Sequence, residues 1–381
     1  MEFAPLHLLR IGTIAAVVTF ATGLYGVSGT YPGLYEVSSD CSFRISKTDK
    51  TESILFPIPR NTDWQQIINF NYVFEPEEFL NSVELELDEL GNHIVRMKVA
   101  SEIEGEIVRL QWRAYVLVGD RDLSGIHERT FPFPNEWPDE TLQWLESTHS
   151  VDWKTDEIQA IGDEIRNETN DVFQALGGCY MKFRAIVLSP QYQSTEIADS
   201  CVASDAIERR GFCTSNANLF CSILRSSGIP ARVCSALPAW SRDPFQMHYI
   251  VQAYLPGIGW YSVDPTTMEM GLQPHNQIID YVVSAEDENR SKSRNHVAGG
   301  VPYHTAVELG GDGAIEDFAG LIRNIGDHHI KLFNPFYNSH LRLFHLAQAQ
   351  WERCVASGFE LKLMVEDPDE AIVRILETQS E

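Results

Sequence analysis

Two nearby segments of the chain supply a thiol, an imidazole and a carboxylate, in that order. Residues 209–232 read RRGFCTSNANLFCSILRSSGIPAR, and residues 247–267 read MHYIVQAYLPGIGWYSVDPTT. The first segment predicts a loop that enters a helix at Cys213. The second predicts a β-hairpin that opens at His248 and carries Asp264 on its return strand. These three side chains are the groups that nucleophilic acyl transfer requires.

Cys213 is the cysteine best placed to react as a thiolate. A free thiol has a pKa of about 8.5, and a helix N-terminus together with a nearby imidazolium lowers it. Gly211 lies two residues earlier and permits a tight approach of the loop. The first backbone N–H groups of the helix are available to a developing oxyanion. Cys221, by contrast, falls among apolar residues at helical spacing and is interpreted as a core residue.

The predicted hairpin decides whether His248 and Asp264 can meet. In an antiparallel hairpin the numbers of paired residues have a constant sum, and two side chains share a face only when their own sum has the same parity. The sum of 248 and 264 is even. The two side chains therefore share a face if the loop holds an odd number of residues or a bulge intervenes, but not across an unbulged two-residue turn. With the right parity, Asp264 lies diagonally across from His248 and accepts its second ring N–H.

These elements together resemble the transglutaminase-like superfamily of papain-like thiol enzymes. The matching positions are Gly211-Phe-Cys213, Ala217, Leu224 to Arg232, His248, Pro256 to Trp260, and Asp264-Pro265-Thr266, and they cover roughly residues 200–267. The resemblance implies an α+β, papain-like transglutaminase core, in which the helix bearing the cysteine packs on an antiparallel sheet bearing the histidine and the aspartate.

The chain departs from the family pattern after the histidine. Relatives often carry an aromatic residue and a glutamate two and four positions later, where this chain has Ile250 and Gln252. The side chain that completes the oxyanion hole in many relatives has no clear counterpart, and the candidates lie near Gln191, Tyr192 and Gln193. The substrate class therefore stays open.

The resemblance implies a catalytic triad of Cys213, His248 and Asp264 that forms a thioester with a carboxamide or peptide carbonyl. Transfer to an amine makes the chain an acyltransferase, and transfer to water makes it an amide hydrolase or protease. The substrate would be a protein, a peptide or a small amide. A hypothesis of another class is a catalytically silent scaffold that uses this fold to bind a protein partner. A misaligned His248 or a buried Cys213 would favour the scaffold.

Composition excludes several other functions. The chain has 29 Lys and Arg against 54 Asp and Glu, a formal net charge of −25, which disfavours binding to a nucleic acid backbone. Its seven cysteines form no CxxC pair, and its histidines lack metal-ligand spacing. We therefore expect no nucleic acid partner, no metal site and no cofactor.

The first 30 residues form a hydrophobic segment, and residues 11–27 carry no charge. Such a segment is a signal, a membrane anchor or a buried element. Export or membrane anchoring is slightly favoured over a cytoplasmic location, with membrane association through this segment.

Three regions follow the hydrophobic segment. Residues 31–130 alternate apolar and polar side chains, which predicts an antiparallel β domain with a hairpin turn at Gly91-Asn92. A proline-rich linker precedes the transglutaminase-like domain, predicted over 140–310. Residues 311–381 are predicted to form a mainly helical C-terminal extension.

Overall fold

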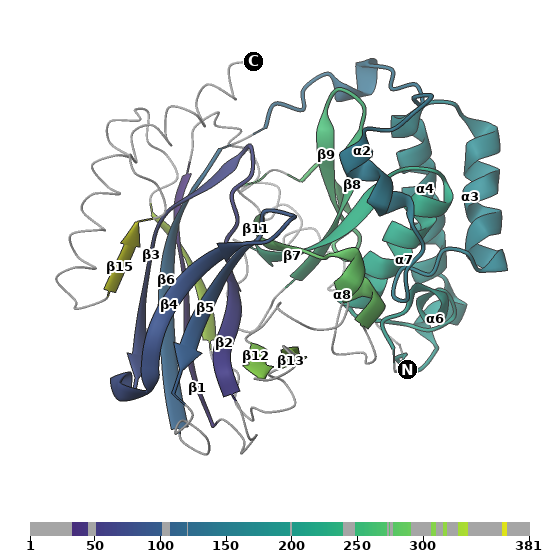
Figure 1. Ribbon diagram of the computed structural model, residues 1–381. Coiled ribbons are helices and arrows are strands. Elements are labelled where there is room, and N and C mark those ends of the chain that lie inside the picture. The colour runs from purple at the N-terminus through teal and green to yellow at the C-terminus, as the bar shows by residue number, and fades with distance from the viewer. Residues whose placement is uncertain are drawn as a thin grey trace, which may run out of the picture.

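The protein has two lobes that lie side by side in the computed structural model (Figure 1). The β lobe contains the strands from residues 33–119 and the later strand segments. The helical lobe contains residues 121–290, with one sheet and the helices that cover it. The structure describes residues 33–44, 51–100, 107–119, 121–198, 200–238, 248–272, 274 and 277–290, and the segments 306–309, 315–317, 327–333 and 360–363.

The β lobe consists of two five-stranded antiparallel sheets. One has the order β14 (Asp327–Phe333), β1 (Gly33–Arg44), β6 (Ile107–Val118), β3 (Gln65–Glu75), β15 (Glu360–Leu363). The other has the order β13 (Ile315–Asp317), β12 (Ala306–Leu309), β2 (Thr51–Ile58), β5 (His93–Val99), β4 (Leu80–Leu87). Apolar side chains of both sheets form one core, where Phe56 stacks on Trp112 with ring centroids 6.0 Å apart. Burying this shared face stabilises the sandwich.

The expected hairpin turn at Gly91-Asn92 is present between β4 and β5. Gly91 has a φ of 75°, a conformation that glycine adopts without steric cost. The Asp88 carboxylate accepts the backbone N–H groups of Leu90 and Asn92 at 2.9 and 2.8 Å, which closes the turn.

The later part of the chain differs from its prediction. In 311–381, where mainly helix was expected, the described residues form the strands β13, β14 and β15. Strand β12, expected within the transglutaminase-like domain, pairs with β2 of the β lobe. Short apolar segments do not distinguish helix from strand by periodicity, and here pairing with the edges of existing sheets decides.

The helical lobe is an α+β structure, as expected. Its sheet has the order β10 (Glu269–Met270), β9 (Gly259–Asp264), β8 (His248–Leu255), β7 (Ala231–Pro238), β11 (Gln277–Val282). Its main helices are α3 (Asp156–Glu168), α4 (Val172–Val187), α6 (Ala203–Glu208) and α7 (Cys213–Ser226). Val251, Ala253 and Val263 join the helices in one buried cluster. The helices therefore cover one face of this sheet, and Figure 1 shows the sheet between them and the β lobe.

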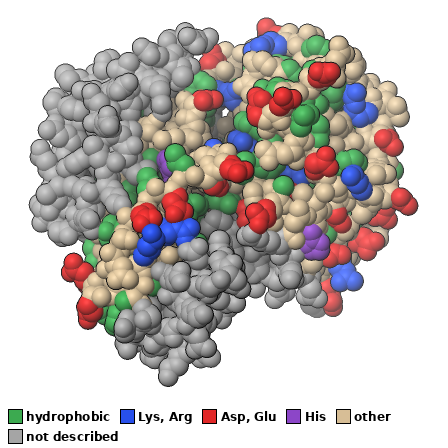
Figure 2. Space-filling view, in the orientation of Figure 1, with side chains coloured by type: hydrophobic (Ala, Val, Ile, Leu, Met, Phe, Trp, Pro, Cys, Tyr) green, Lys and Arg blue, Asp and Glu red, His purple; other side chains and the backbone are tan. Residues whose placement is uncertain are grey.

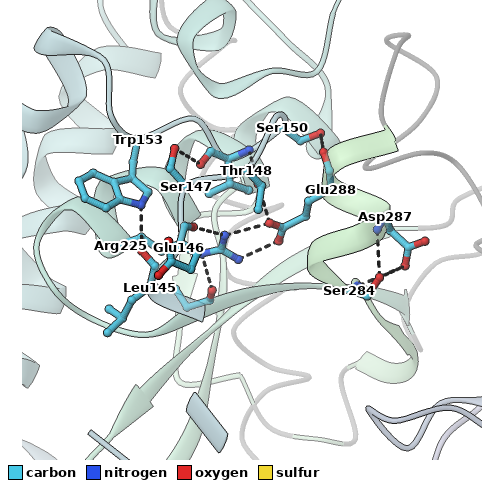
Figure 3. A network of polar contacts seen from close by, with 12 residues as sticks. Leu145, Glu146, Ser147, Thr148, Ser150, Trp153, Arg225, Ser284, Asp287 and Glu288 are labelled. Atoms are coloured by element: carbon cyan, nitrogen blue, oxygen red, sulfur yellow. Dashed lines mark hydrogen bonds and ion pairs between the residues drawn. The ribbon is translucent and has the colours of Figure 1, made fainter. Parts of the chain in front are cut away.

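A buried ion pair anchors the end of α7 (Figure 3). Arg225 and Glu288 have fully buried side chains, and their charged atoms are 2.7 Å apart. Glu288 belongs to α8 (Ala285–Arg290) and also accepts from the Thr148 hydroxyl at 2.7 Å. The Arg225 Nε donates to the carbonyl of Ala231, the first residue of β7. Because each charge is partnered, the pair connects α7, β7 and α8 without leaving a bare buried ion.

Side-chain amides join the two lobes along β11, an edge strand of its sheet. Gln65 donates to the carbonyl of Ile279 at 2.7 Å and accepts its N–H at 3.0 Å. Asn92 makes the same two contacts with Val282, at 2.9 and 2.8 Å. All four bonds are buried, so they satisfy an edge that would otherwise need solvent or another strand.

Across the described part of the chain, no helix is long and apolar enough to cross a membrane. The hydrophobic segment 1–30 lies outside the described residues.

Candidate active site

Cys213 is the first residue of α7, as the sequence predicts. Its side chain is half-buried, and the N-cap residue Phe212 makes no side-chain capping bond. The initial N–H groups of a helix have no partner within the helix, and here no capping side chain takes them up. The helix dipole places partial positive charge at the same end, beside the thiol.

The loop before Cys213 requires glycine at position 211. A Cβ atom there would lie 2.2 Å from the Ser215 Cβ, far inside van der Waals contact. The Gly211 N–H donates to the Tyr192 hydroxyl at 3.2 Å. These contacts hold the loop close against the first turn of α7.

The hairpin has the parity that brings His248 and Asp264 to one face. Val251 pairs with Val263 and Leu255 with Gly259, which leaves a three-residue loop. A loop with an odd number of residues was one of the two predicted ways to bring these side chains to one face, and it is the one that the structure shows. Gly259, where the return strand begins, has a φ of 83°, which favours glycine.

Asp264 is held by four hydrogen bonds and is fully buried. Its Oδ2 lies 2.6 Å from the His248 Nε2 and accepts from the Gln277 Nε2 at 3.0 Å. Its Oδ1 accepts the backbone N–H groups of Thr266 and Thr267 at 2.8 and 3.1 Å. Burial alone would raise the pKa of Asp264, but the hydrogen bonds and the charge of His248 lower it. The carboxylate therefore stays ionised.

His248 connects Asp264 to Cys213. Burial alone would lower the pKa of His248, but hydrogen bonds and charge interactions with Asp264 and Cys213 outweigh burial and raise it to about 9. Because Nε2 bonds to Asp264, the other ring nitrogen, Nδ1, remains for the thiol. The structure thus brings the three predicted residues together, with the His248 imidazole between the Cys213 thiol and the Asp264 carboxylate.

The other described cysteines lack this environment. Cys179, Cys201, Cys221 and Cys234 are all buried and free of disulfides. Burial raises the pKa of Cys179 and of Cys221 to about 12. Their thiols therefore remain protonated, and Cys221 is a core residue of α7 as expected.

Two further polar residues, Gln277 and Tyr192, lie near the site. Gln277 contacts Asp264 from β11, thirteen positions along the chain, and no motif signals it. Among the three oxyanion candidates, Tyr192 reaches the loop before Cys213, whereas Gln191 is exposed and Gln193 donates to the carbonyl of Val187. The Tyr192 hydroxyl accepts from Gly211 and keeps its own O–H to donate.

Gln252 replaces the expected glutamate without leaving a gap in the hydrogen bonding. Its Oε1 accepts from the Arg232 Nε at 2.9 Å, and its Nε2 donates to the Ser262 hydroxyl at 3.1 Å. The described residues include no cluster of three or more His, Cys, Asp or Glu side chains arranged to hold a metal ion.

Comparisons with known proteins identify one superfamily and similar folds. The sequence model of the transglutaminase-like superfamily matches residues 159–265. A protein-glutamine gamma-glutamyltransferase of Pseudomonas aeruginosa is 25% identical over 175 residues, which cover 39% of this chain and 26% of that protein. The match therefore spans about a quarter of the relative's length.

Two solved structures are also similar. A candidate cysteine protease from Cytophaga hutchinsonii superposes with a TM-score of 0.55 at 16% identity, over 81% of this chain and 94% of that one. The periplasmic domain of TgpA from Pseudomonas aeruginosa matches with a TM-score of 0.33 at 16% identity, over 63% of this chain and 88% of that domain. The first of these shows a shared fold that extends over both lobes.

The fold is papain-like, and the comparisons support a thiol enzyme in general. Within that class, residues 159–265 are similar to the core of the transglutaminase-like superfamily.

Proposed function

We propose that the protein transfers an acyl group from an amide to an amine or to water through a thioester on Cys213. In this proposal His248 is the general acid and base, and Asp264 positions it. The observation that carries the proposal is the continuous set of contacts from the thiol at the start of α7, through the imidazole, to the buried carboxylate.

Acylation begins with attack of the Cys213 thiolate on the amide carbonyl carbon. The new C–S bond pushes one electron pair onto the carbonyl oxygen, and backbone N–H groups at the start of α7 stabilise this oxyanion. When the oxyanion collapses, the C–N bond breaks and the amine takes a proton from the His248 imidazolium. The products are the free amine and a thioester, with His248 left neutral.

Deacylation runs the same steps with a second nucleophile. Neutral His248 removes a proton from an amine or a water molecule as it attacks the thioester carbonyl. The C–S bond then breaks and restores the thiolate beside the imidazolium. An amine gives a new amide, and water gives a carboxylic acid.

A glutamine carboxamide in a protein or peptide is the acyl donor that we propose to test first. This choice follows the name of the Pseudomonas relative, a protein-glutamine gamma-glutamyltransferase, of which this chain covers 26%. The scaffold hypothesis gains no support, because Cys213 is half-buried rather than enclosed and His248 bonds to its partner. A location outside the cytoplasm stays a prediction, which the N-terminal sequence of the native protein would test.

The first experiment is alkylation with iodoacetamide at mildly acidic pH, followed by intact mass spectrometry. We expect rapid labelling at one site, its loss in Cys213→Ala, and slower labelling in His248→Ala. Cys221→Ala is the matched control, since it removes a buried thiol from the same helix and should label like the wild type. Slow labelling spread over several cysteines would contradict an assembled site.

The second experiment measures ammonia released from a glutamine-containing peptide, with and without a primary amine such as dansylcadaverine. Dansyl incorporation would indicate transamidation, and ammonia release without incorporation would indicate hydrolysis. A protein that labels rapidly but releases no ammonia would retain the reactive thiol and exclude glutamine as the donor.

A further inference from the structure

A cavity lies between the lobes, on the face of the catalytic sheet that the helices do not cover. Its volume is about 470 Å³, within the range of small-molecule sites, roughly 300–1,000 Å³. The β lobe contributes the segment 60–65, and β8, β9 and β11 contribute side chains that include Gln252 and Trp260. Among the described residues that line it, neither Cys213 nor His248 is present, so it is separate from the acyl-transfer site.

The charge of the cavity opposes the charge of the chain. Its lining includes three arginines, Arg60, Arg121 and Arg232, and one acidic residue, Asp63. The formal charge of the lining is therefore three minus one, or +2. The whole chain carries −25. Figure 2 shows acidic side chains spread over the helical lobe and Lys or Arg side chains bordering the hollow between the lobes. An anion is therefore drawn to the cavity and repelled by most of the remaining surface.

Arg232 is held in one orientation there. Its guanidinium lies over the Trp260 ring at 3.9 Å from the centroid, and its Nε donates to Gln252. Burial lowers the pKa of Arg232 to about 10, so an anionic partner would offset part of its desolvation. A guanidinium fixed in this way suits a planar carboxylate, which it can bind through two parallel N–H groups.

Gln277 adds an unused acceptor at the same cavity. Only 3% of its surface is exposed, and its Nε2 donates a hydrogen bond to Asp264. Its Oε1 has no hydrogen-bond partner. A buried acceptor left without a donor costs about 1–3 kcal/mol, so a ligand N–H or O–H at this position would be stabilising.

We propose that this inter-lobe cavity binds a small organic carboxylate that also carries an N–H or O–H donor. The carboxylate pairs with Arg232, the donor reaches the Gln277 Oε1, and the apolar part of the ligand packs on the aromatic lining. Because Gln277 also holds Asp264, occupancy has a direct route to the orientation of His248. This last consequence rests on the proposed catalytic function, whereas the binding itself does not.

The test uses hippurate, which combines a carboxylate, an amide N–H and an aromatic ring. Binding is measured by titration calorimetry on the full chain carrying Cys213→Ala, which cannot form a thioester. Failure of the proposed catalysis would therefore leave the binding result unaffected. We expect a Kd below about 1 mM, and no detectable heat of binding up to 10-fold above that concentration would overturn the proposal.

Two analogues separate the two recognition groups without altering the protein. Methyl hippurate lacks the negative charge, and 3-benzoylpropionate replaces the amide N–H by CH₂. Each should bind at least about tenfold more weakly than hippurate, a loss of about 1.4 kcal/mol. Equal binding of all three compounds would show non-specific apolar association and would overturn the proposal.

A matched pair of variants then locates the binding. Arg232→Gln should weaken hippurate binding by at least about tenfold, whereas Arg184→Gln, an exposed arginine on α4, should not change it. A thermal melt confirms that each variant is folded. Unchanged binding in folded Arg232→Gln would place the ligand elsewhere and refute the assignment.

Discussion

The hydrogen bonds around Asp264 predict a specific effect of Asp264→Asn. Because Oδ1 accepts the N–H groups of Thr266 and Thr267, the amide oxygen of asparagine must take that position. The amide NH₂ then replaces Oδ2 and faces the Nε2 atom of His248. His248 can accept from this NH₂ only as the tautomer with its proton on Nδ1, the nitrogen that serves Cys213. That tautomer cannot take the thiol proton.

The size of the effect follows from the pKa of His248. It stands at about 9, against 6.5 for an ordinary histidine. Each pH unit corresponds to about 1.4 kcal/mol, so the surroundings of His248, with burial opposing the contacts to Asp264 and Cys213, favour the imidazolium by a net of about 3 kcal/mol. Losing most of this lowers the proton affinity of His248 by about 100-fold. The analogous substitution in serine proteases lowers kcat by about 10⁴, and we expect a loss of about 10³–10⁴ here.

The assay is the rate of iodoacetamide labelling of Cys213 at pH 6, with glutamine-peptide turnover as a second measurement. Asp156→Asn, an exposed aspartate at the start of α3, is the control for the chemical change and should behave as the wild type. If Asp264→Asn folds and labels as fast as the wild type at pH 6, Asp264 does not maintain the imidazolium and the reasoning is refuted.

Three further predictions concern the surrounding structure. Glu288→Gln leaves the Arg225 charge buried without an ion partner, so the free energy of unfolding should fall by about 3–5 kcal/mol. Calorimetry should show a melting temperature lower by roughly 10 °C. Gly211→Ala places a Cβ 2.2 Å from the Ser215 Cβ, so it should destabilise the fold by about 1–3 kcal/mol and slow alkylation, with rescue by Ser215→Gly. Because the pKa of His248 is raised to about 9, its stabilising contribution is complete below pH 6.5 and lost as the pH rises through about 9. The acylation rate, which needs the imidazolium, should fall over the same upper range in a stopped-flow pH profile.

Each of these predictions has a control. Glu286→Gln removes an exposed carboxylate from the same helix as Glu288 and should change stability by less than about 0.5 kcal/mol. Gly177→Ala adds a Cβ in α4 where no atom lies within 4 Å, so it should not destabilise the protein. The second prediction is contradicted if Ser215→Gly does not rescue Gly211→Ala. The first is contradicted if Glu288→Gln melts at the wild-type temperature, and the third if the acylation rate stays constant to pH 10.

Most of the candidate site was predictable because its parts are local. The start of α7 at Cys213 follows from a glycine loop before an apolar helical pattern, and the meeting of His248 with Asp264 follows from the parity of one short hairpin. The parity rule needed the loop length, which a Pro-Gly-Ile-Gly sequence leaves open between two and several residues. The structure supplied the three-residue loop.

The prediction failed where the conformation of a segment depends on a distant partner. Residues 327–333 lie in the region 311–381 that was predicted to be mainly helical, but they form a strand that pairs with β1 from nearly 300 residues earlier in the chain. A seven-residue segment has no strong preference of its own, and the free edge of a sheet supplies the hydrogen bonds that decide it.

The sequence by itself determined the order of the chemical groups, the helix that opens at Cys213 and the hairpin that carries His248 and Asp264. Sterics, turn chemistry and hydrophobic periodicity act over a few residues, so these features can be read locally. Only the tertiary structure decided that Gln277 supports Asp264, that Gln65 joins the lobes across 214 positions, and that three arginines share one cavity. Contacts of this kind depend on how complete elements pack, and no short stretch of sequence specifies them.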